Sequence, residues 1–265
     1  MQLTDKQLQS YEDDGFLILP GLFSGAEVAV LREAMERVFK QDSPGNIREK
    51  KSQVVRMAMG LSQRDEVFAK LARHPRIIEP AQQIAGPQLY LQQSKINVKA
   101  AFDGEAWQWH QDFSTHHVDD GVPKPLALNL HVFIDEVNEF NGPLYFIRGS
   151  HRFGPARSFH DTASTSYPLW VVEQDTVREL SKYKGLVSAT GPVGTALIFG
   201  DCLVHGSPPN FSPWHRAIFS IIVNPIANSY THSQRPDYIH HRALTPITTL
   251  ADNCLLEQLT ESLVS

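Results

Sequence analysis

Residues 107–113 read Trp-Gln-Trp-His-Gln-Asp-Phe, an aromatic segment with two metal-ligand side chains near its end. Side chains alternate between the two faces of a β-strand. A strand here would place His110 and Asp112 on the same face, where both can reach one ion. The flanking aromatic residues suit the end of a strand at the mouth of a barrel. A His-x-Asp pair alone is weak support for a metal site, because it is more often structural.

A third ligand-type side chain, His205, lies in Leu203-Val204-His205-Gly206-Ser207, shortly after the apolar segment 195–199. Two histidines and one carboxylate on one face form a facial triad. Such a triad leaves coordination positions open and is typical of non-haem Fe(II) oxygenases. The chain holds 12 histidines, which also hints at a metal. We therefore expect His110, Asp112 and His205 to bind the metal and to form the catalytic centre.

Arg216 follows His205 at the start of the apolar segment 217–223, which reads as a strand. A hairpin would return this arginine to the side of the barrel that carries His205. A guanidinium can clamp a carboxylate through two parallel hydrogen bonds. The distal carboxylate of 2-oxoglutarate requires such a partner while its keto-acid end chelates iron. The alternative interpretation of Arg216 is a surface salt bridge.

The segments around these motifs alternate between short apolar runs and turn residues. Such a pattern indicates short strands, and many of them together indicate a sandwich or jelly-roll barrel. The runs read as strands are 89–91, 95–98, 126–134, 144–147, 195–199 and 217–223.

The sequence before residue 88 has a helical pattern. We expect helices over 4–13, over 24–40 and, in two short pieces broken at His74-Pro75, over 64–85, with a short strand at 15–20 between the first two. Ser24 and Glu27 have capping-box spacing at the start of the second helix. Residues 42–62 are polar and contain proline and glycine, which predicts a loop or lid. Residues 150–190 form a weakly patterned insertion with a helix near 173–184.

The composition excludes several classes of protein. The 265 residues are 42% hydrophobic and carry a net charge of −5, which is ordinary for a globular protein and argues against a nucleic-acid or anionic-membrane partner. The N-terminal residues lack a signal-peptide pattern, and no run approaches the roughly 20 apolar residues of a membrane span. Cys202 and Cys254 are expected to be reduced thiols in a cytoplasmic protein. We expect one domain over 1–265.

Taken together, the motifs resemble the phytanoyl-CoA dioxygenase superfamily of Fe(II)/2-oxoglutarate oxygenases. Within it, they are most similar to bacterial ectoine hydroxylases and free-proline 4-hydroxylases. The resemblance covers nearly the whole chain, from Gly15 to Pro246. It is carried by Gln93–Lys99, Trp109–Phe113, Asp119–Gly121, Asn141–Leu144, Gly149–His151 and His205–Ser207, with Asn210, Ser212, Pro213 and Arg216.

The resemblance implies a mostly β fold with flanking helices and a double-stranded β-helix core, a jelly roll of the cupin type. The helical part would end at about 87, the core would span about 88–225, and a C-terminal segment would follow over 226–265. It further implies Fe(II) on the three predicted ligands, with 2-oxoglutarate and O₂ as co-substrates. The residues implied for 2-oxoglutarate are Arg216, helped by Asn97, Asn129 and Ser207, with Trp107 as a wall.

Two residues bear on the reaction. Asn129 stands where ectoine hydroxylases tend to show serine. Related halogenases lack the carboxylate that Asp112 supplies, so its presence favours hydroxylation of an unactivated C–H bond, with release of succinate and CO₂, over halogenation.

No acyl-CoA groove or basic cluster for CoA phosphates is evident, so we expect a small zwitterionic substrate, above all a free amino acid. His116 stands where ectoine hydroxylases tend to carry tryptophan, which puts ectoine itself in doubt; a histidine there could hydrogen-bond a carboxylate instead. The candidates for the substrate carboxylate are Arg242, Arg56 and Lys95, and those for the ammonium are Gln93, Ser114, Thr115 and the neighbourhood of Asp112.

Two alternatives remain at this point. The same cofactor chemistry could act on a carrier-bound or specialised-metabolite scaffold. A non-catalytic, metal-binding cupin-like barrel is the other, and the intact triad and Arg216 argue against it. The chain is expected to act as a monomer or homodimer in a biosynthetic pathway.

Overall fold

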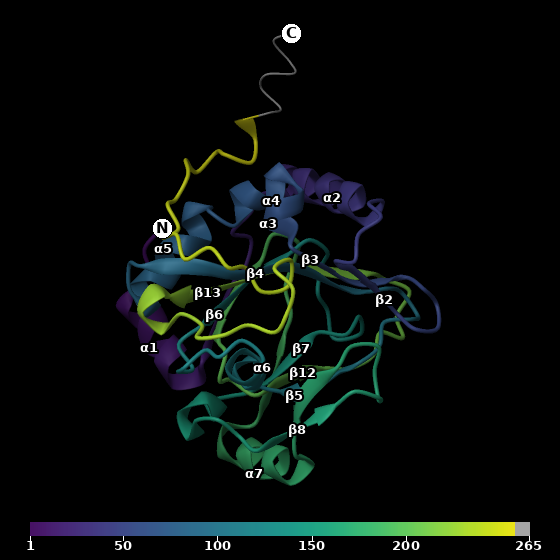
Figure 1. The fold of residues 1–265 in the computed structure, drawn as a ribbon, viewed down its shortest axis with the longest axis vertical. Helices are drawn as coiled ribbons and strands as arrows, with labels where there is room; N and C mark the ends of the chain where they lie inside the picture. Colours follow the sequence, from purple (N-terminus) through teal and green to yellow (C-terminus); the bar gives the residue numbers. More distant parts are fainter. Residues whose placement is uncertain (258–265) are drawn as a thin grey trace.

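The computed structural model describes residues 1–257. Two antiparallel sheets enclose the interior, with strand orders β1-β11-β6-β13-β4-β3-β2 and β10-β7-β12-β5-β9-β8. Figure 1 shows α2 to α5 covering one side of the larger sheet and α7 at the opposite end of the molecule. The predicted fold class, a double-stranded β-helix core with flanking helices, is confirmed. The single domain over 1–265 stays a prediction.

The larger sheet contains seven strands. They are β1 Phe16–Leu19, β2 Asn46–Arg48, β3 Val55–Met59, β4 Leu89–Lys99, β6 Leu128–Phe133, β11 Ala196–Gly200 and β13 Arg216–Pro225. The smaller sheet contains six strands. They are β5 Trp107–His110, β7 Leu144–Ile147, β8 Ser158–Asp161, β9 Leu169–Val172, β10 Leu186–Ala189 and β12 His205–Ser207.

The N-terminal helices begin where their caps predict. Thr4 caps α1 (Asp5–Asp14), and Ser24 and Glu27 form the capping box of α2 (Gly25–Phe39). The two short helices predicted over 64–85 form as α4 and α5, with His74 capping the second, and one further short helix, α3, precedes them. These helices are α3 Leu61–Arg64, α4 Glu66–Leu71 and α5 Pro75–Ala85.

The prediction of a loop over residues 42–62 was wrong in part. β2 and β3 form a hairpin there, and β3 pairs with β4 at the edge of the larger sheet. Met57, Ala58 and Met59 are buried despite the polar composition of the surrounding segment. Residues 49–54 connect the two strands, so any lid at this place is limited to the tip of a hairpin.

The insertion 150–190 carries the predicted helix as α7 (Gln174–Lys184), and it also adds β8, β9 and β10 to the smaller sheet. The sequence did not reveal these strands because each has only four residues and β8 is half-exposed. Two predicted strands, 89–91 and 95–98, are one continuous strand, β4. Its polar middle, which faces the interior, hid that continuity.

Two apolar clusters leave a space between the sheets. The larger one joins α2, α4 and α5 to the larger sheet, and the smaller one, around Phe133, Phe146 and Phe199, fills part of the space between the sheets. The remaining interior is lined by both polar and apolar residues. Cys202 and Cys254 are both free and buried. Among residues 1–257, no helix has both the length and the apolar character needed to cross a membrane.

Candidate active site

His110 and Asp112 lie at a junction between a strand and a helix. β5 ends at His110, Gln111 has extended backbone geometry, and Asp112 is the first residue of α6 (Asp112–Val118). The prediction that one strand carries both ligands was therefore wrong, although the two side chains still converge. The side-chain amide of Gln111 donates to Cys202 O at 2.6 Å and to Gly154 O at 3.1 Å. These contacts anchor the turn between the two ligands.

β12 brings His205 next to β5, in register with His110. The two imidazole rings lie 4.1 Å apart between centroids. Nε2 of His110 is 3.7 Å from Asp112 Oδ1, and Nε2 of His205 is 3.8 Å from Asp112 Oδ2. One ligand atom from each of the three residues lies within 4.8 Å of the other two. The structure thus brings the three predicted ligands together.

Both imidazoles are held in one tautomer. Nδ1 of His110 donates to Gln108 O at 2.6 Å, and Nδ1 of His205 donates to Leu203 O at 2.9 Å. Each Nε2 lone pair is left for a metal, the arrangement that backbone carbonyls usually impose on metal-binding histidines. Two imidazoles and a carboxylate suit a divalent first-row metal.

The protonation states also suit metal binding. Burial, together with the neighbouring His205, lowers the pKa of His110 to about 3. Burial lowers the pKa of His205 as well. Burial alone would raise the pKa of Asp112, but His205 and Lys95 outweigh it and hold this pKa below its ordinary value. At neutral pH the cluster therefore consists of two neutral imidazoles and one carboxylate.

A pocket opens onto the three ligands. It contains most of the predicted site residues and several that were not predicted. The predicted ones are His110, Asp112, His205, Arg216, Asn97, Asn129, Trp107, Gln93, Lys95, Thr115 and His116. The others are Met57, Met59, His131, Leu144, Tyr167, Leu169, Phe199, Ile218 and Arg235.

Arg216 lies in this pocket, is 1% exposed and begins β13. Within the described residues, its Nε and Nη2 have no hydrogen-bond partner, and neither have Asn97 Oδ1 and both amide atoms of Asn129. Burial, and then repulsion from Arg56, lowers the pKa of Arg216 to about 9. Buried polar groups in proteins are normally satisfied. These unsatisfied groups beside a ligand cluster fit a bound dicarboxylate such as 2-oxoglutarate.

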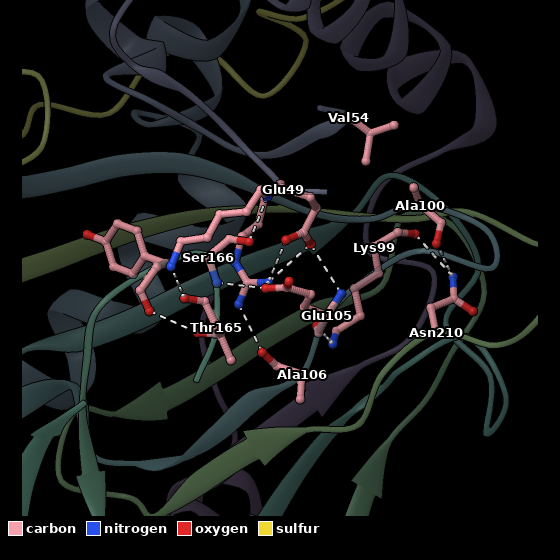
Figure 2. A network of polar contacts seen from close by, with 12 residues as sticks. Glu49, Val54, Lys99, Ala100, Glu105, Ala106, Thr165, Ser166 and Asn210 are labelled. Atoms are coloured by element: carbon pink, nitrogen blue, oxygen red, sulfur yellow. Dashed lines mark hydrogen bonds and ion pairs between the residues drawn. The ribbon is translucent and has the colours of Figure 1, made fainter. Parts of the chain in front are cut away.

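Arg56 does not support its predicted substrate role. Its guanidinium is 3.1 Å from Glu49 and 3.3 Å from Glu105, and lies 4.1 Å above the Trp107 ring. Figure 2 shows Glu105 between Glu49 and the 165–166 segment: Glu105 N donates to Glu49 at 3.1 Å, and Ser166 N donates to Glu105 at 2.7 Å. Arg56 does not line the pocket. Its guanidinium instead binds residues that hold the fold together.

Three other predicted residues also lie outside the pocket lining: Ser114, whose hydroxyl accepts from Ser158 Oγ, Ser207 and Arg242. Ser207 is buried and donates to Gly142 O at 2.9 Å. Arg242 is exposed, and its guanidinium donates to His240 O and Arg235 O. The arginine that the C-terminal segment does place in the pocket is Arg235, which the sequence reading missed. Its signal was the Asp119-Asp120-Gly121 motif, because Asp120 binds Arg235 through both carboxylate oxygens.

Known proteins share the fold and the length of this chain. The family model for phytanoyl-CoA dioxygenase matches residues 11–218. L-proline trans-4-hydroxylase from Streptomyces griseoviridis is 35% identical over 89% of this chain and 92% of its own length. Ectoine dioxygenase from Bordetella parapertussis is 34% identical, covering 94% of this chain and 87% of its own.

A solved structure agrees with these relatives. EctD from S. alaskensis with 2-oxoglutarate and 5-hydroxyectoine has a TM-score of 0.83 and 30% identity, covering 94% of this chain and 87% of that one. The family match extends over most of the chain and includes β5, α6 and β12, which carry His110, Asp112 and His205. The chain therefore belongs to the phytanoyl-CoA dioxygenase family.

Proposed function

We propose that this protein is an Fe(II)- and 2-oxoglutarate-dependent dioxygenase that hydroxylates an unactivated C–H bond of a free amino acid or a similar small zwitterion. The observation that carries the proposal is the pairing of the three-ligand cluster with the unsatisfied guanidinium of Arg216 in one pocket. A purely metal-binding barrel has no use for a buried arginine without a partner. The relatives named proline hydroxylase and ectoine dioxygenase support the same reading.

His110, Asp112 and His205 would hold the iron, and Arg216 with Asn97 and Asn129 would hold 2-oxoglutarate. When bound, the iron, 2-oxoglutarate and O₂ together supply the oxidant, while 2-oxoglutarate is converted to succinate and CO₂. The protein's own share is positioning and the exclusion of water. Trp107 would form one wall of the co-substrate site. The apolar side chains of Met57, Met59, Leu169 and Ile218 would keep the reacting C–H bond away from solvent.

The substrate end of the pocket holds groups that suit a carboxylate. Arg235 lines the pocket while Asp120 fixes its orientation. Lys95 lines it as well, and its Nζ donates to Gln93 Oε1 at 3.3 Å. We assign the substrate carboxylate to Arg235, with Gln93, Lys95 and Thr115 as neighbouring polar contacts. The protein would act on this small molecule in the cytoplasm, as a monomer or homodimer.

A substrate screen tests this proposal. Purified protein with Fe(II), 2-oxoglutarate and O₂ is incubated with each of the twenty amino acids and with ectoine, and products are measured by mass spectrometry alongside succinate. We expect one or more compounds to gain a single oxygen atom with matching succinate formation. Succinate formation without any hydroxylated panel member would reject the amino-acid assignment and favour a carrier-bound or specialised-metabolite scaffold. Tight Zn²⁺ binding with no 2-oxoglutarate turnover would reject the proposal that the protein is an enzyme.

Asp112→Ala is the matched variant for the metal ligand. The substitution removes the carboxylate from the cluster, so we expect loss of hydroxylation together with weaker metal binding, measured by equilibrium dialysis. Full activity in this variant would disprove the ligand role of Asp112.

A further inference from the structure

A buried histidine–aspartate pair lies beside the ligand cluster and has no part in the chemistry described so far. His116 on α6 is 2% exposed, and Asp201, in the turn after β11, is fully buried. Nδ1 of His116 is 3.4 Å from Asp201 Oδ2. The backbone fixes Asp201, because its N–H donates to Ala127 O and its carbonyl accepts from Phe113 N.

The pair is incomplete on the side that faces the pocket. His116 is one of the lining residues, and its Nδ1 is directed at a carboxylate. A proton on Nδ1 leaves the lone pair of Nε2 as an acceptor. Within residues 1–257, no hydrogen bond is made by Nε2 of His116, and Asp201 Oδ1 is buried without a partner.

The charges in the pocket include no obvious partner for a substrate ammonium among the described residues. Among residues 1–257, Lys95, Arg216 and Arg235 are the cationic lining residues, whereas Asp112 is the only acidic one. Asp112 belongs to the ligand cluster. A zwitterionic amino acid brings an ammonium as well as a carboxylate, and no free carboxylate in the lining is left to receive that ammonium.

We propose that His116, oriented by Asp201, recognises the amine of the substrate through its Nε2. This inference rests on the proposed function, because it names the group that distinguishes an amino acid from a simple carboxylic acid. Asp201 is a positioning residue: it fixes the tautomer of His116 and places a negative charge one imidazole away from the pocket.

The spacing on α6 explains why an imidazole suits this position. His116 follows Asp112 by four residues, so both lie on the same helix face about 5–6 Å apart. A carboxylate at position 116 would compete for the metal as a hard anionic ligand. The histidine–aspartate pair keeps the second carboxylate out of the cluster, which comprises only His110, Asp112 and His205 among the described residues.

The test compares matched substrates in three variants. The substrates are the amino acid that the wild type hydroxylates best and its analogue without the amine; for L-proline this analogue is cyclopentanecarboxylic acid. In Asp201→Asn, we expect the KM for the amino acid to rise about tenfold, which corresponds to about 1.4 kcal/mol. We expect kcat and the KM for 2-oxoglutarate to stay within about twofold, and the KM for the analogue to stay unchanged.

His116→Leu should raise the KM for the amino acid further than Asp201→Asn does. His116→Gln should recover part of this loss of binding, because glutamine keeps a hydrogen-bonding atom near the Nε2 position. His117→Gln is the matched control. His117 is the next residue on α6, but it is exposed, stacks on Phe113 and donates from Nδ1 to Val122 O. This variant should behave as the wild type.

Three outcomes would overturn the inference. An unchanged KM for the amino acid in both Asp201→Asn and His116→Leu is the first. An equal loss for the amino acid and its analogue is the second, because it would indicate a merely structural role. The third is a wild type that forms succinate but hydroxylates no amine, and this result alone would also remove the amino-acid substrate. Should Asp201→Asn melt far below the wild type, the two His116 variants decide.

Discussion

Two buried arginines, Arg56 and Arg216, are each 1% exposed, yet they have opposite surroundings. Arg56 meets two carboxylates, a backbone carbonyl and the face of an indole ring. Arg216 forms no ion pair with any described residue, and its Nε and Nη2 lack partners. Burial alone therefore does not reveal the role of a charged residue; its state of pairing does.

The difference follows from the cost of burying charge. A buried ion is tolerated when it is paired and hydrogen-bonded, and it is costly otherwise. At Arg56 the protein itself supplies the counter-charge, so the residue stabilises the junction of the β2–β3 hairpin with the 165–166 segment. At Arg216 no described residue supplies the counter-charge, and we propose that a bound ligand does so.

Arg56→Met should destabilise the protein strongly. The substitution leaves Glu49 buried without its partner, and breaking a buried ion pair from one side costs about 3–5 kcal/mol. Urea unfolding followed by circular dichroism measures the change. The double variant Arg56→Met, Glu49→Gln should recover part of the loss, because it removes the stranded charge. A stable single variant would show that Arg56 is not a structural residue.

Arg216→Leu should affect ligand binding more than folding. Loss of the carboxylate clamp should weaken the binding of 2-oxoglutarate by roughly 2–4 kcal/mol, which raises its Kd about 30-fold to 1000-fold. The free energy of unfolding of the ligand-free protein should stay unchanged or rise, because an unpaired buried charge is removed. Anaerobic calorimetric titration and urea unfolding give the two readouts. Unchanged 2-oxoglutarate affinity would contradict the assignment.

Asp201 provides a third buried charge, whose effect depends on pH. Burial raises the pKa of Asp201 to about 6, whereas an unfolded aspartate titrates near 4. The folded protein binds this proton more tightly between those pH values, so this group's contribution to stability falls as pH rises through the window. Relative to Asp201→Asn, the metal-free wild type should lose up to about 3 kcal/mol between pH 4 and pH 7. Thermal melts at both pH values measure it; parallel pH profiles would refute it.

Lys182→Ala gives the smallest effect. Lys182 pairs with Glu179 on α7 at 2.7 Å, but both side chains are largely exposed. Exposed pairs contribute little because water screens them, so the free energy of unfolding should change by less than about 0.5 kcal/mol. Urea unfolding is again the measurement. A larger loss of stability would mean that an ion pair stabilises this protein even where both side chains are exposed.

The candidate metal cluster could be predicted because each ligand stands in a recognisable local pattern: His110 and Asp112 form a His-x-Asp pair, and His205 closely follows an apolar strand. The ligand types of His110 and Asp112 and their spacing survive even though the segment bends from strand into helix. Arg235 could not be predicted in the same way. Its place in the pocket depends on Asp120, which lies 115 residues earlier in the chain. The predicted candidate was Arg242 instead, which lies seven residues later and is exposed.

The fold shows the same division. Apolar runs predicted most strands of the larger sheet, because nearly every residue of β6, β11 and β13 is buried. The β2–β3 hairpin escaped prediction because its stability depends on distant partners: β4 alongside it and Glu105 against Arg56. Sequence patterns predict which residues are buried. They do not predict as readily which charged residues form pairs with one another.

The bend from β5 into α6 has a consequence for how substrate preference can change. Asp112, Thr115 and His116 lie at the first, fourth and fifth positions of one short helix, and all three line the pocket. The first position belongs to the candidate metal cluster, whereas the other two lie outside it. Different positions of this one helix therefore bear on the reaction and on substrate preference. Duplicated copies of such a gene could acquire new substrates through one or two codons while the oxidising machinery stays intact.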